Sequence, residues 1–223
     1  MRVIRPGHEI LLMPDPADIL KNIELAGRTC YKSEDKITPD SARDFVRRIL
    51  KSGHHSVIEH VNVTVRFVCD RGVTHELVRH RLASYSQEST RYANYSKDRF
   101  GSEITVIRPL FWATDSAEYK AWHAAMEAAE KAYMGLLEMG ARPEQARSVL
   151  PNSLKTEIVM TANVREWIHV FNLRCSKRAH PQIREIMLPL LAEFHANIPV
   201  IFDEQHARHE RDIGEIARLH ARE

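Results

Sequence analysis

The stretch RHRLASYSQESTRY, residues 79–92, is the most unusual segment of the chain. Its first thirteen positions hold three arginines, a histidine, three serines, a glutamine and a glutamate. Such a segment is too polar for a strand of a hydrophobic core, and it carries both signs of charge. We therefore expect a loop that binds an anionic group. The identity of that group has to come from the rest of the chain.

The composition is that of an ordinary globular protein with a buried core. Of the 223 residues, 43% are hydrophobic and 28% are charged. The 32 lysines and arginines nearly balance the 30 aspartates and glutamates, which does not favour binding to nucleic acid or to a membrane. The three cysteines form no disulfide pattern and no apolar leader segment is visible, so we expect a cytoplasmic protein.

Hydrophobic periodicity predicts helices mixed with a few short strands. Apolar and polar residues alternate over 61–67, which is the clearest strand signal in the chain. Further strands are predicted at 9–13, 103–107 and 156–162, and helices at 16–30, 38–52, 72–83, 115–139, 143–150, 164–174 and most of the tail from 181. Strands and helices do not alternate strictly, so the predicted fold class is α+β. We expect one domain over 1–223, with a helical C-terminal extension from about 200.

Several common site motifs are absent. The glycines never form GxG, which removes the dinucleotide fingerprint and the phosphate loop. HELVRH, residues 75–80, has one residue too many for the zinc motif HExxH, and side chains five apart on a helix diverge. GHHSVIEH, residues 53–60, is rich in histidine but lacks a further patterned ligand. We predict no metal site.

The polar stretch offers donors that suit a phosphate. Ser89, Thr90 and Arg91 supply hydroxyl, backbone N–H and guanidinium groups, while Tyr85 and Tyr92 offer faces for a planar ring. Two more segments carry arginines, EQARSVLP at 144–151 and TANVREWIHVFNLRCS at 161–176. These features suit a nucleotide or a flavin, although a loop whose charges only pair with one another would share some of them.

Taken together, these segments resemble the flavin-dependent thymidylate synthases, also called thymidylate synthase-complementing proteins. The signature of that family is RHR, seven residues, then S-x-R. It reads here as Arg79-His80-Arg81 and Ser89-Thr90-Arg91. GHHSVIEH, EQARSVLP and TANVREWIHVFNLR occur in the family's order, so the resemblance spans roughly residues 10–200.

The resemblance implies an enzyme that methylates dUMP to dTMP in thymidylate biosynthesis. Methylenetetrahydrofolate gives the carbon, NADPH reduces a bound FAD, and the reduced flavin gives the hydride. The family resemblance also implies a homotetramer with active sites at subunit junctions, and a central, mainly antiparallel sheet flanked by helices. No membrane and no nucleic acid is implied as a partner.

The resemblance assigns roles to individual residues. Arg174 matches the catalytic arginine, whose guanidinium stabilises the charge left on uracil when its N3 proton is lost. His54 and Glu59 match positions near the flavin. The implied FAD contacts are Ser56, Arg79, His80, Arg81, Gln87, Asn163, Arg165 and His169. The implied dUMP contacts are Glu76, Arg79, Gln87, Glu88, Ser89, Thr90, Arg91, Arg147 and Arg174.

Two other functions are consistent with parts of the sequence. A non-catalytic nucleotide- or RNA-binding module would use the basic stretch with Tyr85 and Tyr92, although the near-neutral charge argues against it. A flavoprotein of the same fold acting on another pyrimidine is the third hypothesis. The C-terminal histidines, His206, His209 and His220, are predicted to lie on a solvated helix.

Overall fold

The computed structural model describes residues 1–97 and 101–221. Contacts divide the chain into two compact units, and each is described by itself. Unit 1 comprises Met1–His8, Arg66–Arg79 and Tyr85–Val159. Unit 2 comprises Glu9–Val65, His80–Ser84 and Met160–Glu223. The single domain over 1–223 stays a prediction.

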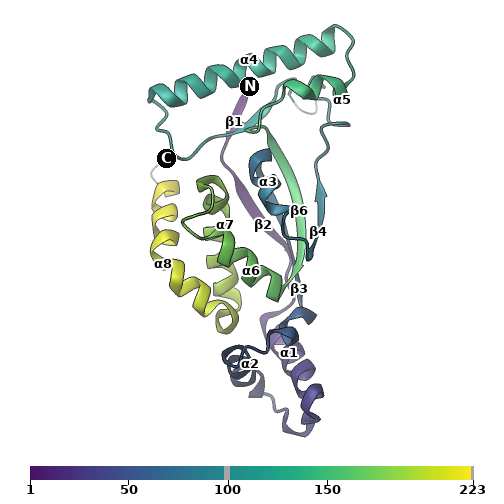
Figure 1. Cartoon of the computed structure of the whole chain (residues 1–223), viewed down its shortest axis with the longest axis vertical. Coiled ribbons are helices and arrows are strands. Elements are labelled where there is room, and N and C mark those ends of the chain that lie inside the picture. The colour runs from purple at the N-terminus through teal and green to yellow at the C-terminus, as the bar shows by residue number, and fades with distance from the viewer. Residues whose placement is uncertain (98–100, 222–223) are drawn as a thin grey trace. The chain divides into compact units, whose positions relative to one another are not determined.

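The α+β prediction is confirmed. An antiparallel sheet of four strands, in the order β2-β3-β6-β4, is flanked by helices (Figure 1). A second sheet pairs β1 with β5 in parallel, with Val3 opposite Val106. The strands are β1 (Arg2–Ile4), β2 (Gly7–Leu12), β3 (Asn62–Asp70), β4 (Ala83–Gln87), β5 (Thr105–Ile107) and β6 (Lys155–Asn163).

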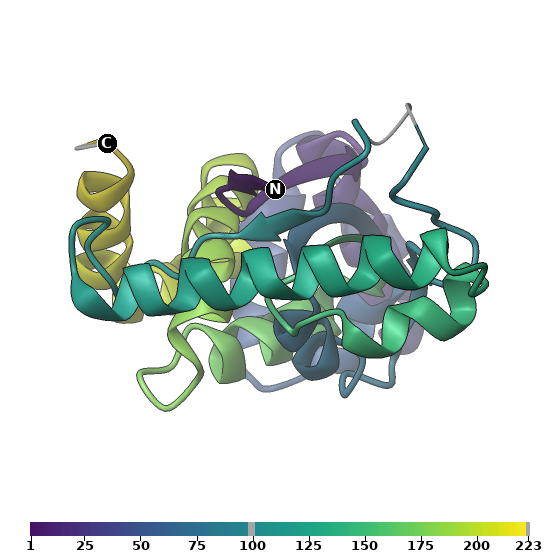
Figure 2. The same cartoon turned by 90° about the horizontal axis from the view of Figure 1, so that it is seen from above.

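Unit 1 buries its core under one long helix. Trp122, Met126 and Tyr133, at the predicted helical spacing, pack in a cluster with Val106 and Leu154. The helix that carries them, α4, lies alongside the short α5 (Figure 2). The helices of this unit are α3 (Arg71–Leu77), α4 (Ala117–Glu138) and α5 (Pro143–Ala146), with a 3-10 turn, η4 (Arg147–Val149).

Unit 2 has an aromatic core. Trp167 and Phe171 pack with Phe194 and Phe202, with neighbouring ring centroids 5.2 to 5.8 Å apart. These rings join three helices, α6, α7 and α8. The helices of this unit are α1 (Pro16–Tyr31), α2 (Ser41–Lys51), α6 (Val164–Arg174), α7 (Pro181–Asn197) and α8 (Pro199–Ala221), with 3-10 helices η1 (Glu34–Lys36) and η2 (His55–His60).

The prediction for the polar stretch was wrong in part. The helix expected over 72–83 ends at Leu77, and Ala83–Gln87 forms strand β4 instead of a loop. β4 is an edge strand of the sheet, with Ser84 and Ser86 exposed and the other three residues, Ala83, Tyr85 and Gln87, half-buried. An edge strand tolerates polar side chains because one of its sides faces solvent. The alternation of exposed and half-buried residues along β4 does not show in the sequence, because polar residues occupy both faces of the strand.

The prediction of a solvated C-terminal helix was also wrong. α8 packs against α2, α6 and α7. His209 is buried, and the ring of His220 lies 3.2 Å from a carboxylate oxygen of Glu185. The buried face changes along the helix from apolar, at Phe202, to polar, at His209 and Asp212. Polar residues at a core position give no apolar period, so the sequence did not indicate this burial.

Over the described ranges, none of the helices combines the length and the apolar character that crossing a membrane requires.

The packing of α1 on α2 depends on Gly27. A Cβ at this position would lie 2.6 Å from ring atoms of Phe45, whereas a Cβ at Gly135 in α4 would meet nothing within 4 Å. We expect Gly27→Ala to lower the free energy of unfolding by about 1–3 kcal/mol. Gly135→Ala should raise it by about 0.5–1 kcal/mol through helix propensity. Denaturant unfolding of both variants checks this, and a Gly27→Ala protein as stable as Gly135→Ala would contradict the close approach.

Candidate functional site

Asn163 sets the start of α6, the helix that carries two of the predicted cofactor residues, Arg165 and His169, and the predicted catalytic Arg174. It is the last residue of β6 and the N-cap of α6, and its side-chain oxygen accepts a hydrogen bond from the Glu166 N–H at 2.8 Å. The strand therefore passes directly into the helix with no loop. Arg165 and His169 lie on the exposed face of α6.

A buried histidine connects the two ends of α6. Arg174 donates from Nε to His80 Nε2 at 3.0 Å, and His80 Nδ1 lies 3.3 Å from Glu166 Oε1. A guanidinium can only donate, so Nε2 must accept, and His80 is neutral with its proton on Nδ1. That proton is directed at Glu166. The His169 ring packs edge-on against His80, with centroids 5.5 Å apart.

The charges around His80 keep it neutral. Burial, the positive charge of Arg174 and the neighbouring His169 together lower the pKa of His80 to about 4, and burial is the largest of these causes. Burial also raises the pKa of Glu166, while His169 acts in the opposite direction. The contact between His80 and Glu166 is thus a hydrogen bond of a neutral imidazole near neutral pH, and Arg174 supplies the positive charge of this cluster.

Three side chains of this cluster, those of His80, Glu166 and His169, have atoms of the kind that bind metal ions within 4.8 Å of one another. Such a group could hold a metal ion in principle. However, Arg174 already donates to Nε2 of His80 and adds a positive charge that opposes a cation. The contacts describe a hydrogen-bonded cluster, and we assign no metal to it.

A pocket of about 410 Å³ in unit 2 collects further predicted cofactor residues. Ser56 is presented by η2, and Arg165 reaches the pocket from the first turn of α6 while forming an ion pair with Glu59. The Tyr31 hydroxyl lies 3.5 Å from His54 Nδ1. Hydroxyl, imidazole and guanidinium groups suit an anionic ligand. The pocket is lined by Gly27, Cys30, Tyr31, Ile49, Gly53, His54, His55, Ser56, Val57 and Arg165.

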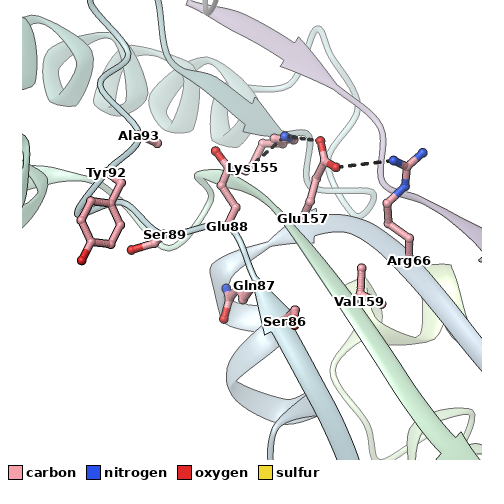
Figure 3. Close-up of a pocket in the computed structure, with 10 residues that line it drawn as sticks. All are labelled: Arg66, Ser86, Gln87, Glu88, Ser89, Tyr92, Ala93, Lys155, Glu157 and Val159. Carbon is pink, nitrogen blue, oxygen red and sulfur yellow. Dashed lines mark hydrogen bonds and ion pairs between the residues drawn. The ribbon is translucent and has the colours of Figure 1, made fainter.

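A second pocket, of about 710 Å³, lies in unit 1 and includes part of the polar stretch (Figure 3). Gln87 is held by hydrogen bonds from its amide nitrogen to the hydroxyls of Thr74, at 3.1 Å, and Thr156, at 3.3 Å. This fixes the end of β4 and the start of the following loop. The lining residues are Arg66, Ser86, Gln87, Glu88, Ser89, Tyr92, Ala93, Lys155, Glu157 and Val159.

A chain of alternating charges forms one side of this second pocket (Figure 3). Lys155 lies 3.2 Å from Glu88 and 2.7 Å from Glu157, and Arg66 lies 3.9 Å from Glu157. Burial alone would lower the pKa of Lys155, but its hydrogen bonds to the two glutamates raise it overall. The Tyr95 hydroxyl also donates to Glu88, at 3.1 Å. The negative charge of Glu88 is therefore balanced by the positive charge of Lys155 within the protein.

The rest of the polar stretch is tied to the turn after α5. Thr90 is buried, and its hydroxyl accepts from Arg147 at 3.3 Å. Arg91 is exposed and lies over the Tyr92 ring at 5.4 Å. Arg79 and Arg81 are exposed, and Glu76 is half-buried. The structure thus brings together His80, His169 and Arg174 in one cluster of unit 2, Ser56 and Arg165 at the pocket of unit 2, and Gln87, Glu88 and Ser89 at the pocket of unit 1. The other predicted residues line neither pocket; they are Glu76, Arg79, Arg81, Thr90, Arg91, Arg147 and Asn163.

Sequence reasoning missed Glu166 and Lys155. Glu166 lies four residues before the buried Val170, so a carboxylate on the apolar face of a helix was a signal that could have identified it. Lys155 has no such signal, because its partner Glu88 is distant in sequence. Of the three cysteines, only Cys30 lines one of the two pockets described. Cys69 and Cys175 are buried, and burial raises the pKa of both thiols, that of Cys175 to about 12.

The α+β fold thus carries two pockets lined by hydrogen-bond donors and a cluster in which the half-buried Arg174 contacts the buried His80, and such donor groups suit an anionic ligand. Comparison with known sequences then identifies the family. Residues 12–200 match the sequence model of the thymidylate synthase complementing protein family, and the chain belongs to this family.

The relatives carry the name flavin-dependent thymidylate synthase. One from Geobacter sulfurreducens is 36% identical over 201 residues, which cover 87% of this chain and 85% of the relative. One from Pyrococcus abyssi is 39% identical over 163 residues, or 73% of this chain and 66% of the relative. One from Mycobacterium sp. (strain JLS) is 36% identical over 202 residues, or 81% and 77%.

The neutral state of His80 makes stability depend on pH. The unfolded-state pKa of histidine is about 6.5, and the folded-state pKa of His80 is about 4. Between these values the unfolded chain binds more protons, so the free energy of unfolding falls as pH falls through this window, by about 1–3 kcal/mol. Denaturant unfolding at several pH values checks this. His80→Gln should flatten the profile and His123→Gln, at a half-exposed site, should not; equal profiles for all three proteins would contradict it.

Proposed function

We propose that this protein is a flavin-dependent thymidylate synthase that converts dUMP to dTMP with methylenetetrahydrofolate as carbon donor, FAD as cofactor and NADPH as reductant. The observation that carries the proposal is that the family match over residues 12–200 includes every residue of the proposed site. The relatives' shared name supports the same activity. A non-catalytic nucleotide- or RNA-binding module is not favoured.

The residues of unit 2 fit FAD by the chemistry of their donors. Ser56, His54 and Arg165 around the 410 Å³ pocket offer the hydroxyl, imidazole and guanidinium groups that a diphosphate takes. FAD, when bound, supplies the hydride chemistry that the amino acids lack. Asn163 would use its amide nitrogen, since its oxygen caps α6. The proposed FAD contacts are Ser56, Arg79, His80, Arg81, Gln87, Asn163, Arg165 and His169.

Arg174 is the proposed catalytic residue. Its Nε–H is directed at His80, which orients the planar guanidinium. We assign its terminal nitrogens to a carbonyl oxygen of uracil, where the positive charge stabilises the anion formed by loss of the N3 proton. That anion pushes electron density toward C5, the atom that must attack. Neutral His80 adds no charge of its own, so Arg174 alone sets the potential contributed by this pair.

The pocket of unit 1 is the proposed site for dUMP. Ser89, Thr90 and Arg91 offer hydroxyl and guanidinium donors for the phosphate, and Arg147 holds the Thr90 hydroxyl. Because Lys155 neutralises Glu88, this glutamate adds little repulsion toward a phosphate. The proposed dUMP contacts are Glu76, Arg79, Gln87, Glu88, Ser89, Thr90, Arg91, Arg147 and Arg174. A homotetramer with sites at subunit junctions, the use of NADPH and a cytoplasmic location complete the proposal.

The visible spectrum of the purified protein tests the function. We expect flavin bands that bleach anaerobically with NADPH and return only when dUMP and methylenetetrahydrofolate are both added, with dTMP formed. A colourless protein that takes up no added FAD would exclude the proposed enzyme. Flavin bands that return with UMP or dCMP but not with dUMP would assign the protein to another pyrimidine.

Arg174→Ala separates cofactor binding from chemistry. The variant should retain FAD, because the Ser56 pocket does not include Arg174, and should lose most methyl transfer. FAD content by absorbance and dTMP formation under single turnover are the measurements. A product rate within about threefold of the wild type, under ~1 kcal/mol, would rule out the charge-stabilising role.

Two exposed arginines, Arg91 and Arg165, allow the proposed dUMP and FAD contacts to be tested against each other. Arg91→Ala should weaken dUMP binding much more than FAD binding, while Arg165→Ala should do the reverse, since each removes charge-assisted hydrogen bonds to one ligand only. Both ligands are titrated against both variants, with a loss of roughly tenfold expected for the matching pair. Equal weakening of both ligands in either variant is the result that contradicts the assignment.

A further inference from the structure

The C-terminal end of α6 is held from outside the helix. The last carbonyls of a helix have no partner within it. At the C-cap of α6, directly after Arg174, the carbonyl oxygen of Cys175 accepts a hydrogen bond from Arg184 Nε at 3.2 Å. A guanidinium at the negative end of a helix dipole is favourable in charge as well as in hydrogen bonding. Arg184 belongs to α7, so α7 fixes the position at which α6 ends.

Arg184 is in turn oriented by α8. Its terminal nitrogen donates to Asp212 Oδ2 at 2.9 Å, and Asp212 is only 8% exposed. Two more basic side chains lie close to this carboxylate, Lys177 at 3.9 Å and His209 at 4.0 Å. A largely buried carboxylate needs such partners to remain ionised. The chain of contacts therefore runs from Asp212 through Arg184 to the residue that follows Arg174.

A second contact ties α8 to α6 on the other side of Arg174. Arg208 donates to the side-chain oxygen of Asn172 at 2.9 Å and pairs with Glu204 in its own helix. Positions 172 and 175, which flank Arg174, are thus both held by interactions that involve α8. Since α8 is Pro199–Ala221 and the family match ends at residue 200, nearly all of this helix lies beyond the part of the chain that defines the family.

We propose that Arg184 and Asp212 are positioning residues for Arg174, and that α8 serves the reaction by fixing the last turn of α6. The expected effect on catalysis rests on the proposed function. The expected effect on the position of Arg174 does not depend on it. Loss of either residue releases the Cys175 carbonyl and lets the last turn of α6 fray. Arg174 then moves away from His80, the group it contacts at 3.0 Å.

The state of His80 reports the position of Arg174 without any ligand. In the wild type the ring stays neutral between about pH 5 and 8, because burial and Arg174 hold its pKa low. In Asp212→Ala, where Arg174 is displaced, the contribution of Arg174 to the low pKa is lost while that of burial remains, so the pKa of His80 should rise above its wild-type value. Imidazole nuclear magnetic resonance follows it, with the His80 signal assigned by its loss in His80→Gln. A change confined to stability would not move this titration.

A matched control lies on the same helix. Arg211 is 85% exposed and, among the described residues, pairs along α8 with Glu215 at 3.0 Å, so Arg211→Ala removes an ion pair without touching α6. It should leave the His80 titration unchanged. In assays, Asp212→Ala should keep its FAD and lose on the order of 10- to 100-fold in kcat/KM for dUMP, the scale of a misplaced catalytic group. Arg211→Ala should keep the wild-type value.

A folded Asp212→Ala protein with a wild-type His80 titration overturns the proposal, as does an equal shift in Arg211→Ala. Where Asp212→Ala does not fold, Arg184→Lys decides. A lysine keeps the charge beside Asp212 but cannot bond Asp212 and the Cys175 carbonyl through a rigid fork, so the pKa of His80 should again rise above its wild-type value. An unshifted His80 in that variant overturns the proposal. A wild-type protein without thymidylate synthesis would instead refute the proposed function and leave the His80 result standing.

Discussion

The hydrogen bond from Arg174 to His80 constrains the chemistry of unit 2 more than any other contact. A guanidinium has no acceptor, so the imidazole must present a lone pair, and its remaining proton must face Glu166. One donor therefore fixes the charge and tautomer of a buried ring and the orientation of a carboxylate. Burial acts in the same direction, because it disfavours the imidazolium. A protein that uses Arg174 to stabilise an anion gains from a neighbour that adds no second positive charge.

The two pockets solve the problem of holding anions in different ways. In unit 2, donors come from the short η2 and from the first turn of α6, where the helix presents its positive end. In unit 1, Lys155 and Arg66 alternate with Glu88 and Glu157, so the pocket contains charge of both signs in nearly equal amounts. Such a balanced surface provides hydrogen-bonding groups without a strong field. That agrees with the near-neutral composition of the whole chain, and with a small-molecule ligand in preference to a polyanion.

The sequence predicted most of the architecture because periodicity and helix caps are local signals. The bounds of α6 were predicted to the residue, and α4 and β3 were recognised from the spacing of their apolar residues. Prediction from the sequence failed where polar side chains occupy buried positions or both faces of a strand. β4 was taken for a loop because both of its faces are polar, and α8 was taken for a solvated helix because its buried positions include His209 and Asp212. The candidate residues came from motif resemblance, but Glu166, Lys155 and Arg184 depend on partners brought together only by folding.

The direct passage from Asn163 into α6 has a mechanical consequence. With 11 residues at 1.5 Å each, the helix is about 16 Å long, and its first residue follows directly on β6 and the Asn163 cap. A tilt of about 5° at Asn163 would therefore carry the far end through about 1.4 Å, nearly a bond length. The length of α6 therefore magnifies a small tilt at its start into a larger displacement at its end, which bears Arg174. In the proposed function this is the catalytic residue, whose position relative to the substrate matters most. The far end is held by side chains of two other helices, Arg184 of α7 and Arg208 of α8.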